Sequence, residues 1–251
     1  MSDLLGSDAM TAGTTTIVGD AGDAIEAYLA RPEIERLRGG VVVIHHMPGF
    51  DRATKEITRR FAELGYDAIC PNLHWRDAPG AAPDDAAAAS RAGGGVPDSR
   101  LIGDVAGAAA FLRSLPTSNG RVGDIGYCSG GRQSVLAACH LDLNASVDCY
   151  GAFVTGEPPA GYPIRVTNLV DQLPALRAPL LGLFGEQDAN PSPDRVAELE
   201  QLLAANGKEF TLHSYPDTGH GFFAVDRVSY RVPAANDGWE RIAAFYAERL
   251  S

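Results

Sequence analysis

The stretch "RVGDIGYCSGGRQS", residues 121–134, decides the fold, because an apolar segment ends at Cys128 and a helix-like segment follows it. Gly126 and Gly130 stand two residues on either side of the cysteine, which gives the pattern Gly-x-nucleophile-x-Gly. So tight a turn strains the nucleophile's backbone, and side chains at the glycine positions would collide with the neighbouring strand and helix. The helix would point the positive end of its dipole at the sulfur and favour negative charge there. We therefore predict a nucleophilic Cys128, with a structural, core-packed cysteine as the alternative.

Strand and helix signals alternate on both sides of this stretch. Two short antiparallel strands are predicted near the start, at residues 14–18 and 24–32. Further strands are predicted within residues 39–49, 66–73, 121–128, 145–154, 178–188 and 209–215, and helices within residues 52–65, 99–115, 192–207 and 237–250. Repeated βα units with nearly continuous apolar strands predict an α/β fold, in which helices flank a mostly parallel central sheet on both faces.

Domain organisation is predicted to be simple, with one domain over residues 1–251. Residues 1–13 are expected to be mobile. Residues 78–98 are rich in alanine, glycine and proline, so we expect a flexible excursion there and a candidate lid. Asp98 or Ser99 is expected to cap the helix that follows.

Composition excludes several classes of partner. The formal net charge is −11 and the isoelectric point is near 4.9, so nucleic acids and anionic membrane surfaces would be repelled. No apolar run is long enough for a membrane span and the start does not resemble a secretion signal, which predicts a cytoplasmic protein. The cysteines form no CxxC pair, and Cys70, Cys139 and Cys149 are predicted to be free thiols packed in the core. A monomer or a homodimer is expected.

Two more reactive side chains follow predicted strands, and ligands of such sheets bind at the carboxyl ends of the strands. Asp188 comes directly after one strand, and His220 lies in the loop before the last helix. The chain order of nucleophile, acid and histidine is that of the α/β-hydrolases. In this interpretation His220 takes the proton of Cys128, and Asp188 orients the imidazole. The backbone N–H groups of Ser129 and Met47 are predicted to form the oxyanion hole.

Each of these assignments has an alternative. Asp188 could instead cap a helix that begins near Pro191, and Glu186 could supply the acid in its place. His220 could be an ordinary loop histidine.

The sequence resembles the dienelactone hydrolase, or carboxymethylenebutenolidase, family from about Ala24 to the C-terminus. The resemblance lies in five ordered motifs, "VVVIHHMPGFD", "GYDAICPNLHWRDAPG", "SNGRVGDIGYCSGG", "FGEQDANPSP" and "DTGHGFF". It implies a single α/β-hydrolase domain that hydrolyses lactones and esters through a Cys, His, Asp triad, carried here by Cys128, His220 and Asp188. It implies no metal and no organic cofactor.

The chain departs from the family pattern at two positions. His46 stands where the family has a glutamate that contacts the resting thiol, so we predict that His46 activates the thiol instead. His45 and His46 point to opposite faces of an extended chain, so only one of them can face the sulfur. Arg76 matches a family arginine that binds a substrate carboxylate, although it could merely pair with Asp77 or another surface acid. At the position of the family's second carboxylate-binding arginine, this chain has Ala224.

Aromatic side chains near the predicted site complete the set of candidate substrate-binding residues. Trp75, Tyr127 and Phe222 could line an apolar pocket, or they could belong to the core.

Taken together, the sequence predicts a cysteine-dependent hydrolase of a lactone or carboxylic ester that forms an acyl-enzyme intermediate. A broader carboxylesterase for neutral esters is one alternative. A non-catalytic small-molecule binding or redox-sensing protein on the same scaffold is the other.

Overall fold

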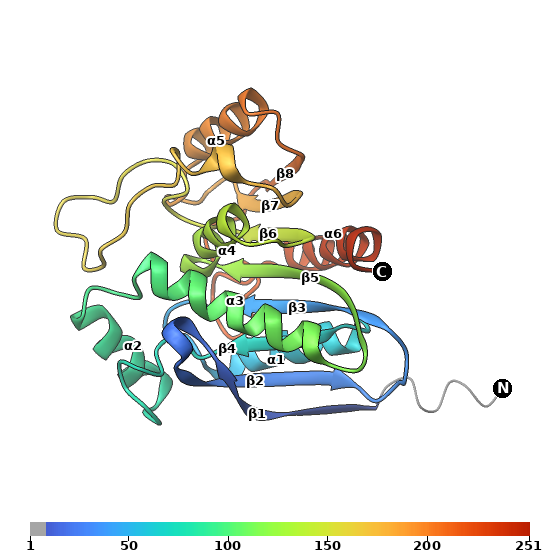
Figure 1. Cartoon of the computed structure of the whole chain (residues 1–251). Coiled ribbons are helices and arrows are strands. Elements are labelled where there is room, and N and C mark those ends of the chain that lie inside the picture. Colours follow the sequence, from blue (N-terminus) through green and yellow to red (C-terminus); the bar gives the residue numbers. More distant parts are fainter. Residues whose placement is uncertain (1–8) are drawn as a thin grey trace.

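A computed structural model describes residues 9–251 and contains one eight-stranded sheet in the order β1-β2-β4-β3-β5-β6-β7-β8 (Figure 1). The strands are β1 Met10–Val18, β2 Ala24–Pro32, β3 Arg38–Ile44, β4 Asp67–Pro71, β5 Ser118–Tyr127, β6 Ala145–Cys149, β7 Leu180–Gly185 and β8 Phe210–Tyr215. β1 pairs antiparallel with β2, and β2 pairs antiparallel with β4. All later pairings are parallel. The α/β-hydrolase fold predicted from the sequence is confirmed.

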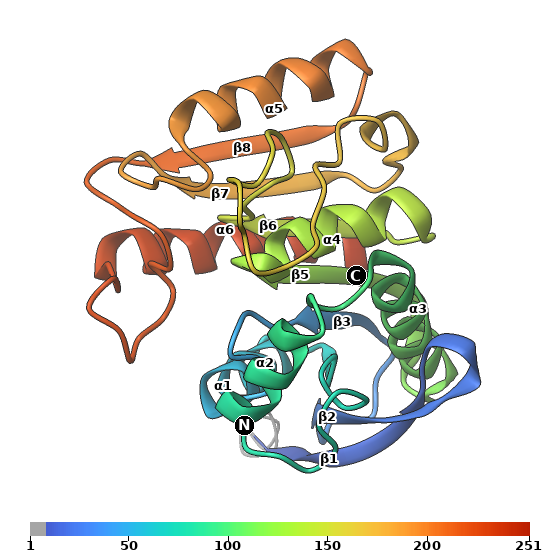
Figure 2. The same ribbon diagram turned by 90° about the vertical axis from the view of Figure 1, so that its left-hand side faces the viewer.

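Helices cover both faces of the sheet (Figures 1 and 2). They are α1 Arg52–Glu63, α2 Pro83–Ala92, α3 Asp98–Ser114, α4 Ser129–His140, α5 Pro193–Ala205 and α6 Val232–Leu250, with short 3₁₀ helices η1 Asp20–Gly22 and η2 Leu173–Ala175. The apolar sides of α3, α4 and α5 share one core cluster with alternate residues of the strands. Those of α1 and α6 form a second cluster on the opposite face. No helix within residues 9–251 is long and apolar enough to cross a membrane.

The parallel strands all end at the same edge of the sheet, which lies toward the left of Figure 1. α2 and the long loop after β6, residues 150–172, lie at this edge. The segment after β4, which contains α2, and the 150–172 loop after β6 therefore meet near Cys128, the residue that follows β5.

Three local predictions need correction. Residues 10–13 are not a mobile start, because they pair with β2, and residues 1–8 lie outside the described residues. The 78–98 segment, predicted as a flexible excursion without regular structure, contains the helix α2, in which Ala86 and Ala87 are buried. Neither Asp98 nor Ser99 caps α3. The cap position is Pro97, and Asp98 is already helical and pairs with Arg132 of α4.

Candidate active site

Cys128 occupies a sharp turn between β5 and α4. Its backbone lies at φ 57° and ψ −120°, outside the regions that residues other than glycine favour. Its N–H donates to the carbonyl oxygen of Cys149 in β6 at 3.0 Å. A β-carbon at Gly126 would overlap the Gly130 carbonyl oxygen, and one at Gly130 would overlap the Ile44 carbonyl oxygen at the end of β3. Both glycines are thus required by the close approach of α4 to β5 and β3.

The structure brings Asp188 and His220 together. Asp188 follows β7, its side chain is 2% exposed, and its Oδ2 lies 2.7 Å from Nδ1 of His220. The other oxygen, Oδ1, accepts the Asn190 N–H at 2.8 Å. Both carboxylate oxygens are therefore held, which fixes the carboxylate against the imidazole.

The alternatives for the acid do not fit this geometry. The N-cap of α5 is Ser192, not Asp188, and Glu186 is exposed to solvent. Asp188 is therefore the carboxylate that contacts His220 within the described chain.

The charge of His220 depends on opposing effects. Burial lowers the pKa of His220, but hydrogen bonds to Asp188 and to Cys128 outweigh it and raise that pKa from 6.5 to about 10. Tyr150 packs its ring edge-to-face against the imidazole, with the ring centroids 5.0 Å apart. The geometry favours an imidazolium between an acid and a thiol.

Ser129 and Met47 face the same cavity as Cys128. Ser129 is the first residue of α4, where backbone N–H groups have no acceptor inside the helix. Met47 lies in the turn after β3. This position suits both N–H groups for the predicted oxyanion hole.

His45 holds the turn that carries Met47. Its Nε2 accepts the Leu73 N–H at 3.1 Å, so Nδ1 carries the proton and donates to the His46 carbonyl oxygen at 2.9 Å. Burial lowers the pKa of His45 to about 3, so the ring stays neutral. Both ring nitrogens are used, and His45 is a structural residue.

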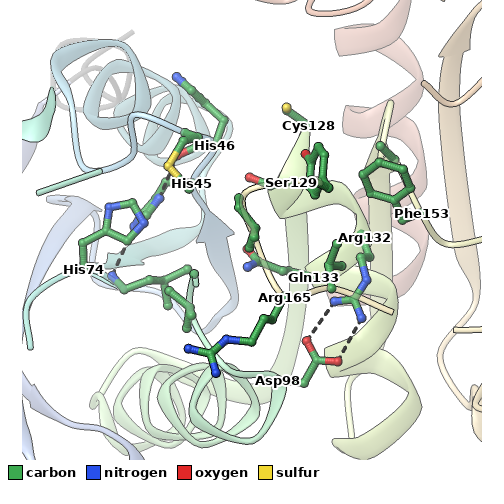
Figure 3. A pocket seen from close by; sticks show the side chains of 18 residues that line it. His45, His46, His74, Asp98, Cys128, Ser129, Arg132, Gln133, Phe153 and Arg165 are labelled. Atoms are coloured by element: carbon green, nitrogen blue, oxygen red, sulfur yellow. Dashed lines mark hydrogen bonds and ion pairs between the residues drawn. The ribbon is translucent and has the colours of Figure 1, made fainter. Parts of the chain in front are cut away.

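His46 does not face the thiol as predicted. Its Nε2 lies 3.2 Å from the Asp51 carboxylate, and its ring points away from Cys128 (Figure 3). Asp51 also caps α1 through the Thr54 N–H at 2.8 Å. The capping carboxylate attracts His46 away from the sulfur, so the activating role assigned to His46 is not supported.

A cavity of about 90 Å³ adjoins Cys128, between the turn after β3, the first turns of α4 and the loops after β4 and β6 (Figure 3). Its lining is largely apolar and includes Met47, Leu73, Val96, Phe153, Tyr162, Ile164 and Val166. Its polar lining includes His74, Asp98, Arg132, Gln133 and the exposed Arg165.

The four predicted substrate-binding residues lie outside this cavity. Arg76 forms ion pairs with Asp23 at 2.7 Å and with the completely buried Asp104 at 2.9 Å. The alternative prediction, that Arg76 pairs with an acid of the protein, is confirmed, but it pairs with Asp23 and Asp104 and not with Asp77. The guanidinium is thus occupied and cannot bind a substrate in this arrangement.

The aromatic candidates belong to the core. Tyr127 precedes Cys128, and the alternation of side chains along β5 turns its ring toward the α6 face, where it packs on Phe223. Phe222 is completely buried against Tyr215. Trp75 packs on the core cluster under α3.

Sequence reasoning missed the polar residues of the cavity. Arg132 donates two hydrogen bonds to Asp98, both at 2.9 Å, and also binds the Thr167 carbonyl oxygen. Arg165 comes from the 150–172 loop and donates to the Gly93 carbonyl oxygen at 2.6 Å. Arg132 could have been found as the residue one helical turn after Cys128, whereas nothing in the pattern of the loop marks Arg165.

Comparison with known proteins gives consistent results. Residues 25–250 match the dienelactone hydrolase family. An Escherichia coli K12 protein named "Putative carboxymethylenebutenolidase" is 34% identical over 244 residues, covering 96% of this chain and 88% of that protein. A Bradyrhizobium protein named "Probable 2-oxo-3-(5-oxofuran-2-ylidene)propanoate lactonase" is 27% identical over 225 residues, covering 88% of each chain. A crystal structure described as a "Putative Dienelactone Hydrolase", from Klebsiella pneumoniae, has a TM-score of 0.82 and 30% identity, covering 95% of this chain and 99% of that one.

Proposed function

The chain belongs to the dienelactone hydrolase family, whose members are ester and lactone hydrolases, and we propose that Cys128, His220 and Asp188 are its catalytic triad. The observation that carries the proposal is the 2.7 Å contact of His220 Nδ1 with the Asp188 carboxylate, near enough to Cys128 for the cysteine to raise the pKa of His220, while Cys128 itself lines a pocket. The nucleophile, the base and the orienting acid follow three separate strands, β5, β8 and β7, whose ends lie at the same edge of the sheet.

The first half of the reaction would form a thioester. With the proton of Cys128 already held on His220, the sulfur attacks the carbonyl carbon of the substrate as a thiolate. The electron pair of the carbonyl moves onto its oxygen, which the N–H groups of Ser129 and Met47 stabilise, each by about 3 kcal/mol. When the intermediate collapses, the leaving alkoxide takes the proton from His220. In a lactone the alkoxide stays attached to the acyl group, so the ring opens.

The second half would release the product. A water molecule gives a proton to His220 and attacks the thioester carbonyl, and the Cys128 thiolate leaves. Asp188 keeps the imidazole in the required tautomer during both halves.

Substrate recognition would rely on apolar contact and on one cation. Arg132 is neutralised by Asp98, whereas no carboxylate of residues 9–251 pairs with Arg165. A carboxylate on the substrate would therefore meet Arg165, and Arg76 would take no part. The mainly apolar lining also favours neutral esters as a second candidate class of substrate.

The test compares the hydrolysis of a dienelactone and of p-nitrophenyl acetate by the wild type and by Cys128→Ala. We expect the wild type to turn over at least one of the two and Cys128→Ala to turn over neither. Cleavage of the ester alone would identify the neutral-ester class. Full activity of Cys128→Ala would refute the proposed mechanism, and inactivity of the wild type on both would favour a binding or redox-sensing protein.

A further inference from the structure

Asp148 is a buried acid that has no role in the proposed reaction. It lies beside the turn between β5 and α4 that carries Cys128, the nucleophile turn. It lies near the end of β6, opposite Gly126 of β5 in the sheet register, and its side chain is completely buried. The next residue, Cys149, accepts the Cys128 N–H. Asp148 is therefore a direct neighbour of the turn that carries the sulfur.

The carboxyl of Asp148 fills the space between two glycines. Its Oδ1 accepts the Gly151 N–H at 2.7 Å, after the end of β6. A β-carbon at Gly131, in the first turn of α4, would overlap the same oxygen. The carboxyl thus separates the start of α4 from the turn after β6 and keeps the two at a fixed distance. Its other oxygen, Oδ2, has no partner among the described residues.

The surroundings of Asp148 offer a negative charge little support. On β5 the nearest acid is the buried Asp124, and on its own strand the neighbouring Cys149 points to the opposite face of the sheet. β7 contributes no titratable side chain, and Arg132 of α4 binds Asp98 instead. Apart from the Gly151 N–H, the charge of His220 is what favours the ionised form.

The neutral acid is the form that this environment favours. Burial raises the pKa of Asp148 from 3.8 to about 7, although the Gly151 N–H and the charge of His220 both act to lower it. A buried carboxylate without a cation in contact is costly, whereas a neutral carboxyl is far less so.

We propose that Asp148 is a positioning residue of the nucleophile turn that works as the neutral acid, and that its ionisation lowers the reactivity of Cys128. An ionised Asp148 would place negative charge behind the first turn of α4. That charge would oppose the helix dipole, which stabilises both the thiolate and the oxyanion. The part that concerns the oxyanion rests on the proposed function of Cys128, and the part that concerns the thiol does not.

The experiment measures two rates between about pH 6 and pH 9 for the wild type and for Asp148→Asn, which mimics the neutral acid. The first is alkylation of Cys128 by iodoacetamide, which needs no substrate. The second is kcat/KM for p-nitrophenyl acetate. We expect both wild-type rates to fall above pH about 7, and Asp148→Asn to be faster than the wild type by about tenfold at the alkaline end while equal to it at the acid end. Asp148→Ala should be slow at every pH, because the space between the glycines is no longer filled.

The matched control is Asp124→Asn, which changes the buried acid that neighbours Asp148 on β5. It should keep the fall above pH about 7. If Asp148→Asn does not fold, infrared titration of Asp124→Asn should show one buried carboxyl losing its proton near pH 7 while alkylation slows in parallel.

A constant ratio of Asp148→Asn to wild type across this pH range, or alkylation that does not slow as the carboxyl ionises, would overturn the proposal. Alkylation that behaves as expected in a protein that hydrolyses neither p-nitrophenyl acetate nor a dienelactone would refute the proposed function and leave the role of Asp148 intact.

Discussion

At the scale of single residues, the protonation of His220 connects the geometry to activity. The pKa of His220 is raised from 6.5 to about 10, so the imidazolium persists through neutral pH and is lost as the pH rises through about 10. A positive His220 stabilises a thiolate at Cys128 and holds a proton for the leaving group. The effect depends on Asp188, which lies 2.7 Å from Nδ1.

Asp188→Asn is expected to lower kcat by about 10³- to 10⁴-fold, because the amide neither stabilises the imidazolium nor enforces the tautomer. The alkaline loss of activity that accompanies deprotonation of His220, which is separate from the roughly tenfold fall above pH about 7 expected from Asp148, should also move down from about 10 toward the ordinary value for histidine. The measurement is kcat against pH. Glu186→Gln, which changes the exposed acid two residues earlier, is the control and should behave as the wild type; a loss in Glu186→Gln instead would reassign the acid.

Arg165→Ala tests the cation of the pocket. The variant should raise KM for a carboxylate-bearing lactone by about tenfold and leave the hydrolysis of p-nitrophenyl acetate within about twofold of the wild type, because only the first substrate has a charge to pair. Arg177→Ala, an exposed arginine outside the cavity, is the matched control. Equal KM values for Arg165→Ala and the wild type would exclude Arg165 from substrate binding.

At the scale of elements, the packing of α4 against the ends of β3 and β5 sets the geometry of the site. The helix must start close to the Ile44 carbonyl oxygen for the Ser129 and Met47 N–H groups to face the same cavity. Gly130 permits that approach because it has no β-carbon. The oxyanion hole is thus a property of how two elements pack, and no single side chain supplies it.

Gly130→Ala is expected to push α4 away from the turn after β3. We expect a loss of about 1–3 kcal/mol in the free energy of unfolding and a fall in kcat larger than the change in KM. Gly13→Ala in β1 provides the control, since its β-carbon would meet nothing within 4 Å. Chemical denaturation and steady-state kinetics measure the two effects, and unaltered kinetics in a folded Gly130→Ala would count against the oxyanion hole described above.

At the scale of the whole molecule, Arg76 ties together segments that are far apart in the sequence. Its guanidinium joins the loop after β4 to Asp23 beside η1 and to Asp104 of α3, whose side chain is completely buried. Because Asp104 would be left as an unpaired buried charge, the loss of Arg76 should cost stability and should not affect substrate binding.

Arg76→Ala is therefore expected to lower the free energy of unfolding by about 3 kcal/mol, with KM unchanged at a temperature where the variant is folded. The double variant Arg76→Ala, Asp104→Ala should recover part of that loss, because it removes the stranded charge. Urea denaturation provides the stability measurement. A raised KM for a carboxylate-bearing lactone with unchanged stability would restore the substrate-binding role.

The sequence was sufficient for the parts of the molecule that local patterns determine. Apolar periodicity located the strands and every helix except α2, and the glycines around Cys128 located the turn. Residues directly after strands, such as Asp188, could be found because parallel strands bring their ends to one edge. The sequence did not predict the direction in which some side chains point. Tyr127 adjoins the nucleophile yet faces the core, and His46 and Arg76 turn toward Asp51 and Asp104, acids whose proximity only the fold creates.

The central claim is that Cys128 carries the acyl group, and mass spectrometry of the protein quenched with acid during the first turnovers of p-nitrophenyl acetate tests it most directly. Cys70, Cys139 and Cys149 are buried and serve as internal controls. We expect an acetyl group on the peptide that contains Cys128 in the wild type and none in Cys128→Ala, which should also be inactive. Turnover by the wild type without an adduct on Cys128, or an adduct elsewhere in an active Cys128→Ala, would contradict the claim.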